Sequence, residues 1–101
     1  MSLTGKQKRF LRAEAHALEP VVMVGKEGLT DTLVEAVSAA LLRHELIKVR
    51  VHESSPIERT DVAAQLPSLT KSELAGHVGR ILILYKRHPH EPTLVLPRDN
   101  G

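Results

Sequence analysis

The apolar residues in the first twenty positions of this chain follow a helical spacing. A stripe with a period of 3.6 residues is formed by Phe10, Leu11, Ala15 and Leu18. Thr4 and Gln7 have the spacing of a capping box, in which each side chain satisfies a free backbone amide of the other residue. Pro20 cannot continue a helix, so the pattern predicts a first helix that ends before it.

A short apolar run and a second helical stripe follow. Residues 21–24 read Val-Val-Met-Val between a proline and a glycine, which is typical of a strand buried on both faces. After the segment Gly25–Gly28, Thr30 or Asp31 can cap a helix. The apolar face of this predicted helix consists of Leu33, Val34, Val37 and Leu41. It is the clearest helix in the sequence.

The spacing changes to a strict alternation from Leu46. The apolar side chains at 47, 49 and 51 alternate with the polar side chains of Lys48, Arg50 and His52. This predicts a strand with one polar face. We interpret Lys48 and Arg50 as part of an ordinary exposed sheet surface.

A third helix is predicted after this strand. Ser55 has the position of an N-cap, Pro56 that of the first helical residue, and Glu58 that of the capping-box partner. The helix is expected to run to about Leu66 and to end before Pro67.

The last third of the chain contains at least one more strand, the apolar segment Ile81–Tyr85. The pattern of residues 72–78 leaves two alternatives open, a strand or a short fourth helix capped by Thr70 or Glu73. Residues 93–96 lie among prolines and could add at most an edge strand.

The predicted elements form one α/β domain, a compact two-layer or three-layer sandwich over residues 1–101. At 101 residues and 42% hydrophobic content, the chain is large and apolar enough for one core. The absence of cysteine excludes disulfides and thiolate metal sites. The sequence shows no secretory leader pattern and no apolar run of about 18 residues, so we expect a cytoplasmic protein without a membrane span.

The distribution of basic residues is more informative than the formal net charge of +2. Four cations precede the first acidic residue, Glu14: Lys6, Lys8, Arg9 and Arg12. A late stretch is also locally positive and contains Arg80, Lys86 and Arg87. The early cluster fits two interpretations equally well, a phosphate-contacting helix face and a solvated helix surface.

The segment Gly25-Lys26-Glu27-Gly28, which we call the glycine turn, lies between a predicted strand and a predicted helix. Two glycines let the backbone approach another molecule closely, and the following helix presents free amides at its positive end. Lys26 adds a mobile positive charge. These features suit an RNA backbone, as in KH domains, but on this motif alone a plain tight strand-to-helix connection is the favoured interpretation.

Other chemistries find little support in the sequence. Phe10 and Tyr85 are the only aromatic residues and lie in apolar stretches, so a base-stacking platform is not expected. The segment His88-Pro89-His90-Glu91 resembles a metal-ligand cluster, but no second cluster has suitable spacing. Phosphate-binding and nucleophile-elbow motifs are missing as well. We therefore expect no enzyme activity, no metal, no cofactor and no small-molecule substrate.

Four separated blocks of the sequence together resemble the CRM domain family, and in particular its free-standing bacterial YhbY-like members. The blocks are Leu3–Arg12 (LTGKQKRFLR), Val24–Thr30 (VGKEGLT), His44–Val49 (HELIKV) and Val78–Lys86 (VGRILILYK). The blocks occur in the same order as in the family, and the resemblance as a whole spans residues 3–87. Residues 88–101 form a proline-containing extension beyond that core.

The resemblance implies a mixed four-stranded sheet flanked by helices in the order α-β-α-β-α-β-β, similar to the C-terminal domain of translation initiation factor three. It also implies that residues 73–78 form a strand. The RNA-binding residues that the resemblance implies are Gly25, Lys26, Glu27 and Gly28 at the loop, with Lys6, Lys8, Arg9 and Arg12 on a basic helix beside it. We add Thr30 after the loop, and Arg80 and Lys86 in the late basic stretch, as further candidates.

The implied partner is ribosomal RNA in precursors of the large ribosomal subunit. We expect the protein to be a monomer. Family members often carry asparagine where this chain has Glu27, whose carboxylate repels phosphate. The alternative function is a protein-interaction module without direct RNA contact.

Overall fold

The computed structural model describes residues 3–98, and it confirms the predicted order of helices and strands. The elements are α1 (Gly5–Ala15), β1 (Pro20–Val24), α2 (Asp31–His44), β2 (Leu46–Val51), α3 (Arg59–Thr70), β3 (Glu73–Val78) and β4 (Ile81–Tyr85). The four strands form one mixed sheet in the order β1-β2-β4-β3. β1 is parallel to β2, and the β2–β4 and β3–β4 pairs are antiparallel.

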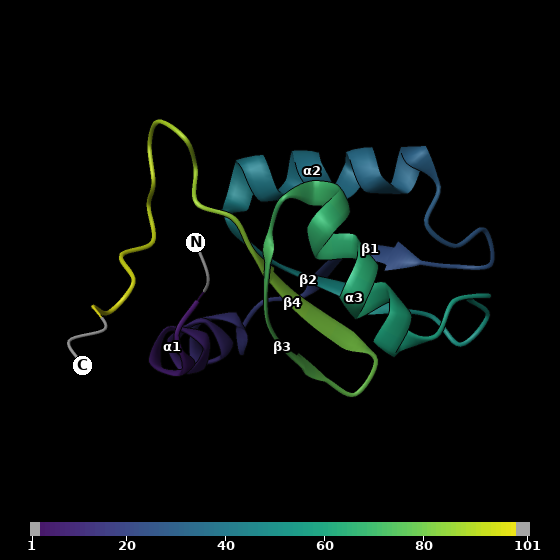
Figure 1. Cartoon of the computed structure of the whole chain (residues 1–101), viewed down its shortest axis with the longest axis horizontal. Helices are drawn as coiled ribbons and strands as arrows, with labels where there is room; N and C mark the ends of the chain where they lie inside the picture. Colours follow the sequence, from purple (N-terminus) through teal and green to yellow (C-terminus); the bar gives the residue numbers. More distant parts are fainter. Residues whose placement is uncertain (1–2, 99–101) are drawn as a thin grey trace.

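The sheet separates two apolar clusters, so the domain has three layers (Figure 1). The larger cluster joins α2 and α3 to one face of the sheet, with Val37, Leu41 and Leu66 among its fully buried side chains. The smaller cluster joins α1 to the other face through Leu11 and Ala15. Burial of these two clusters is the main source of the stability of the fold.

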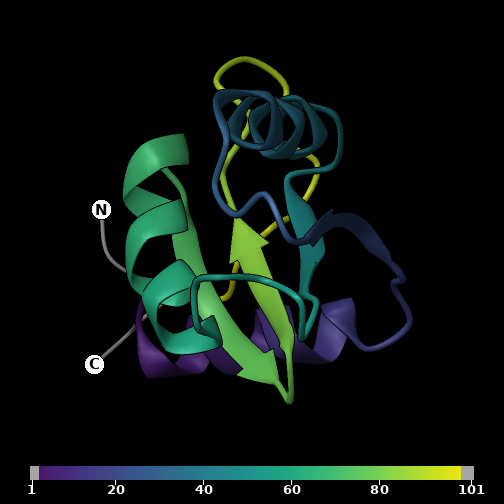
Figure 2. The same ribbon diagram turned by 90° about the vertical axis from the view of Figure 1, so that its right-hand side faces the viewer.

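The first helix begins as the sequence predicts. The Thr4 hydroxyl accepts a hydrogen bond from the Gln7 amide, and the Gln7 side chain accepts one from the Thr4 amide, both at 3.1 Å. Phe10 packs against the smaller cluster and Tyr85 is buried within it, so both aromatics serve packing. In Figure 2, α1 crosses beneath the strands instead of running along them.

The prediction that residues 21–24 are buried on both faces is wrong. β1 is an edge strand, and Val21 and Met23 are 51% and 54% exposed. Val22 and Val24 face the larger cluster under α2. The face with Val21 and Met23 stays open because α1 packs mainly against β3, β2 and β4.

The predicted limits of the third helix are also wrong. Glu58, not Ser55, is the N-cap, and the helix runs through Pro67 to Thr70. The Ser55 hydroxyl instead accepts from the Ile57 amide in the preceding loop. Pro67 removes only one backbone donor, and the fully buried Leu66 before it belongs to the larger cluster, so packing outweighs the local preference for termination.

The segment from Glu73 to Val78 is a strand, as the family resemblance implies, and not a fourth helix. The extension forms no strand within its described residues, 88–98. Leu94 and Leu96 pack against the smaller cluster, and the Gln7 amide group donates to the Pro97 carbonyl at 3.1 Å. The extension therefore covers the flank of α1. None of the helices in the described part of the chain has the length and apolar character needed to cross a membrane.

Candidate nucleic-acid interface

One end of the sheet, on the right in Figure 1, gathers three connecting loops. The parallel strands β1 and β2 both end there, and the turn between the antiparallel strands β3 and β4 lies at the same end. The glycine turn, the loop of residues 52–58 and the turn at Gly79 and Arg80 are consequently neighbours. The Val51 amide at the end of β2 donates to the Arg80 carbonyl at 2.8 Å, and the His52 amide donates to the Val24 carbonyl at the end of β1 at 2.9 Å.

Within the glycine turn, the two glycines have different structural roles. The Gly28 amide donates to the Gly25 carbonyl at 3.0 Å and closes the turn. Gly28 has a φ of +74°, and a Cβ there would lie 3.4 Å from Pro56 and from Ile57. Gly25 has open space at the same position. Gly28 thus serves the conformation of the turn through its positive φ, while Gly25 leaves backbone accessible to a ligand.

The tip of the turn carries the exposed side chains of Lys26 and Glu27. Thr30, by contrast, is the N-cap of α2, and its hydroxyl accepts from the Leu33 amide at 3.1 Å. Its side chain therefore has a structural function. Asp31 in the first turn of α2 already places a negative charge at the positive end of the helix.

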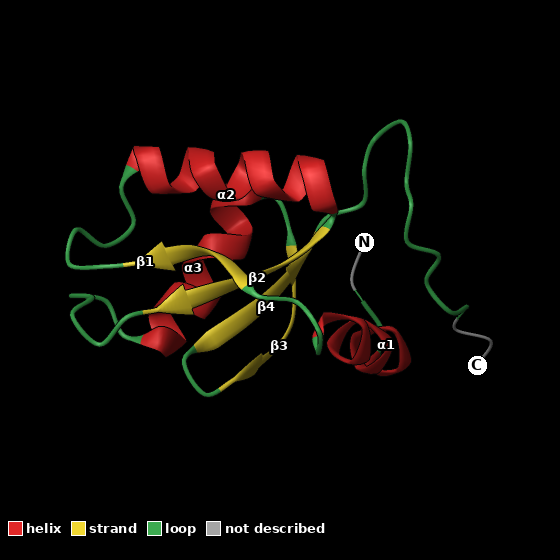
Figure 3. Ribbon diagram, turned by 180° about the vertical axis from the view of Figure 1, so that it is seen from behind, coloured by secondary structure: helices red, strands yellow, loops and turns green. Residues whose placement is uncertain are grey.

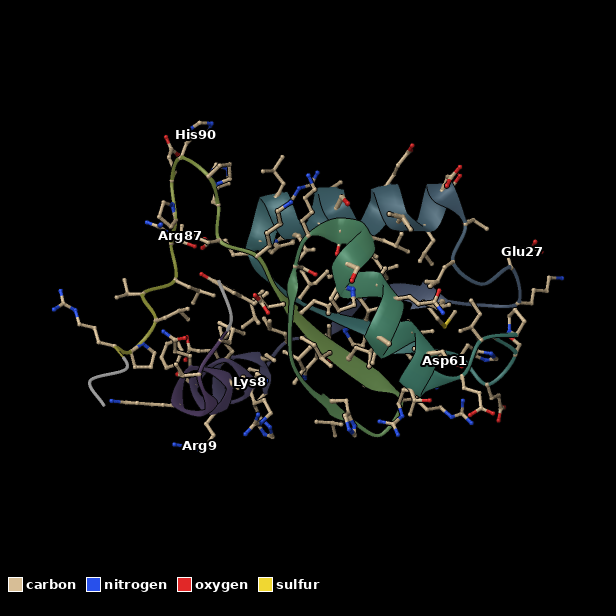
Figure 4. The ribbon with its side chains drawn as sticks, in the orientation of Figure 1. Lys8, Arg9, Glu27, Asp61, Arg87 and His90 are labelled. Carbon is tan, nitrogen blue, oxygen red and sulfur yellow. The ribbon has the colours of Figure 1, made fainter. Side chains whose placement is uncertain are left out.

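The α3 side of this end of the sheet has a cleft of about 550 Å³ with mixed charge. Arg59 and Arg80 line it together with Glu53 and Glu58. The Arg59 guanidinium also contacts Nδ1 of His77 at 2.7 Å. Glu27 and Asp61 add negative charge at the same end (Figure 4). Acidic groups thus offset the cations on this side.

On the other face of the sheet, at this same end, the strands carry no acidic side chains. Arg50 of β2 is exposed there, and its register partners are Met23 on β1 and Ile81 on β4. Val78 of β3, 64% exposed, pairs with Ile81. The sequence interpretation treated Arg50 as ordinary surface, because the position of α1, which leaves this half of the sheet uncovered, has no local sequence signal.

The basic residues of α1 do not lie beside the glycine turn, contrary to the expectation from the family resemblance. Lys8 and Arg9 are at the other end of the long axis from Glu27 (Figure 4). Lys6 and Arg9 are exposed and Lys8 is half-buried. They form a separate positive surface.

Arg12 and Lys86 have partners within the fold. The Arg12 guanidinium donates to the Ala75 carbonyl at 3.0 Å, and its stem crosses β3 where Gly76 has no side chain. The ammonium of Lys86 donates to the Thr70 carbonyl at 3.2 Å, at the C-terminal end of α3. Arg12 nevertheless remains exposed, whereas Lys86 is half-buried at the end of the sheet away from the glycine turn.

The histidine cluster of the extension forms a turn. Nδ1 of His88 accepts from the amides of His90 and Glu91 at 3.1 and 2.9 Å. Over residues 3–98, no three His, Asp or Glu side chains are grouped so that they could hold a metal ion.

Comparisons with known proteins agree with this architecture. The family model of the CRS1/YhbY (CRM) domain matches residues 3–86. A Bacillus subtilis protein named probable RNA-binding protein YqeI is 41% identical over 95 residues, which cover 94% of this chain and 99% of the relative. A Haemophilus influenzae protein named RNA-binding protein is 39% identical over 97 residues, which cover 96% of this chain and 97% of the relative.

A solved structure supports the fold independently. The solution structure of SAV1595 from Staphylococcus aureus has a TM-score of 0.80 and 34% identity to this chain, and the match covers 94% of this chain and 99% of the other. The family match extends over nearly all of the described residues, and the relatives align over almost their full lengths. The chain therefore belongs to the CRS1/YhbY (CRM) domain family.

Proposed function

We propose that this protein binds RNA at the end of the sheet that carries the glycine turn, with Lys26 and Arg50 as the principal phosphate-contacting side chains. The observation that carries the proposal is that Arg50 is exposed on a half of the sheet that α1 leaves uncovered, at the same end as the exposed Lys26 of the glycine turn. The names of the relatives supply the class of ligand.

The uncovered half of the sheet suits an extended or splayed RNA segment. Lys26 and Arg50 supply charges for phosphates, and the accessible backbone at Gly25 allows close approach. Met23 and Val78 offer apolar contact for bases without aromatic stacking. Glu27 opposes binding at the tip of the turn, so the phosphates are expected to follow the Arg50 side and not the acidic α3 side.

The test is a salt titration of binding to ribosomal RNA fragments. Each phosphate contact contributes about −0.7 to −0.9 to the slope of log K against log salt concentration. A Lys26→Glu plus Gly25→Asp variant should lose binding, because both substitutions place carboxylates at an open part of the turn. Arg50→Glu should lower the slope by about one contact or more.

The matched control for Arg50→Glu is Arg43→Glu, which makes the same charge change on exposed α2 surface. Arg9→Glu tests the separate positive surface of α1. Native-like binding by the glycine-turn variant, with loss of binding by Arg9→Glu, would move the RNA site to α1 and refute the proposed location.

We further propose that the RNA is ribosomal RNA in a precursor of the large subunit, and that the protein acts there as a cytoplasmic monomer in assembly. This rests on the family resemblance. The protein should co-sediment with large-subunit precursors at low salt, and the glycine-turn variant should not. If the native protein stays at the top of a sucrose gradient, apart from the ribosomal particles, an assembly role would be contradicted.

A further inference from the structure

A second, chemically different surface lies between the C-terminal part of α1, the start of β1, the end of α2 and the extension. It is a groove of about 440 Å³, within the ~300–1,000 Å³ range typical of ligand pockets. Its apolar lining includes Leu18, Val21, Leu46 and Leu94. Figure 3 shows α1, the segment leading from it to β1, and the extension from this side.

The groove is apolar and partly open to solvent. Leu18 is 39% exposed and Val21 is 51% exposed, although both lie next to buried core residues. The wall is held in place, because the ammonium of Lys48 donates to the carbonyls of Leu18 and His16 at 3.0 and 3.4 Å. A preformed apolar site loses little conformational entropy when it is filled.

The charge at this groove is opposite to that of the proposed RNA site. Glu14 and Glu19 line it, and both are exposed and available to a partner in solution. The lining also contains His44, and the ammonium of Lys48 is held at the wall by the Leu18 and His16 carbonyls, so the two carboxylates outnumber that cation. Carboxylates repel phosphate and attract lysine and arginine, which disfavours nucleic acid and favours a cationic ligand.

We propose that this groove docks an extended cationic segment of a partner protein, in which an aliphatic or aromatic side chain between lysine or arginine residues fills the apolar lining. Glu14 and Glu19 pair with the flanking cations. The protein would thus hold RNA at one end of the sheet and a basic protein segment on the flank of α1. This goes beyond the proposed function and does not depend on it.

The test uses the full chain and three synthetic peptides. The first has phenylalanine between two Arg-Lys pairs, the second replaces its basic residues by glutamine, and the third replaces its phenylalanine by serine. Binding is followed by changes in the amide NMR signals of the protein. Signals of Leu18, Val21 and Leu94 should shift with the first peptide, and the other two peptides should bind at least about fivefold more weakly.

A charge-reversed variant, Glu14→Lys plus Glu19→Lys, should bind the first peptide about fivefold or more weakly than the native protein does. Its matched control is Glu35→Lys plus Glu53→Lys, which changes the charge equally at exposed positions that do not line the groove and should change binding less than twofold. If the charge-reversed variant does not fold, Glu14→Gln plus Glu19→Gln should still weaken binding of the first peptide measurably.

Three outcomes would overturn the proposal: equal binding of the glutamine peptide, shifts confined to other surfaces, or shifts of the groove signals by RNA. Concentration-dependent shifts at the groove without any peptide would instead assign it to a second copy of the chain, and would overturn it as well. Arg50→Glu should leave peptide binding unchanged, which separates failure of this proposal from failure of the RNA proposal.

Discussion

Glu45 offers the sharpest test of how the extension is attached. This residue joins α2 to β2, is only 2% exposed, and has a φ of +63°. One carboxylate oxygen accepts from the His88 amide at 2.8 Å. The other accepts from the Thr93 amide and hydroxyl at 2.7 and 2.6 Å and from the Leu94 amide at 3.0 Å. Glu45→Gln would remove the charge and place an NH2 group against backbone donors.

The pKa of Glu45 gives the expected magnitude. Desolvation by burial raises this pKa, but the hydrogen bonds from His88, Thr93 and Leu94 together outweigh it and lower the pKa from 4.5 to about 2. This difference in pKa sets an upper bound of about 3 kcal/mol on the contribution of the Glu45 carboxylate to the free energy of unfolding. Because the donor residue Thr93 is exposed and the site lies just beneath the surface, solvent screening reduces the contribution, and we expect about 2 kcal/mol.

The sign of the pH dependence follows from the lowered pKa. The folded protein binds this proton less readily than the unfolded chain, so the stabilisation is complete above about pH 4.5 and is lost as the pH falls from there towards about 2. Urea unfolding followed by circular dichroism should show Glu45→Gln less stable than the native protein by about 2 kcal/mol at pH 7. The difference should shrink steadily below pH 4.5.

The matched control is Glu91→Gln, which removes an exposed carboxylate from the same extension. Its free energy of unfolding should equal that of the native protein to within about 0.5 kcal/mol at every pH. If Glu45→Gln retains native stability at pH 7, or if its deficit stays constant between pH 7 and pH 2.5, the carboxylate does not hold the extension in the way that the hydrogen bonds indicate.

Three further predictions follow from packing and charge. Gly76→Ala would place a Cβ 2.6 Å from Cδ of Arg12 and should cost about 1–2 kcal/mol in urea unfolding, but clearly less in an Arg12→Ala background. Gly28→Ala should cost about 1 kcal/mol in the same assay because of its positive φ. Burial and the nearby Glu45 charge raise the pKa of Tyr85, so Glu45→Gln should lower the midpoint of its ultraviolet titration.

The order of elements was predictable because most of their signals are local. The capping box at Thr4 and the alternation after Leu46 depend only on neighbouring residues, and both are confirmed. The segment at 73–78 was ambiguous from its residues, because a bulge between Leu74 and Gly76 interrupts its alternation. Family resemblance resolved it correctly.

The failures concern properties set by distant parts of the chain. The exposure of Met23 depends on where α1 crosses the sheet, and nothing in residues 20–24 records that position. The continuation of α3 through Pro67 depends on the burial of Leu66 in a core built from other elements. The grouping of the candidate site residues could not be predicted for the same reason, because the distance of a lysine or arginine from the glycine turn depends on the tertiary fold.

The crossing of α1 near one end of the sheet connects these observations. Because the helix covers only part of its face, Arg50, Met23 and Val78 stay accessible at the end of the glycine turn. The C-terminal part of α1 also forms one wall of the apolar groove that Glu14 and Glu19 line. A substitution that shifted α1 along the sheet would therefore disturb both proposed surfaces together, whereas substitutions of Arg50 or Glu14 should affect only one.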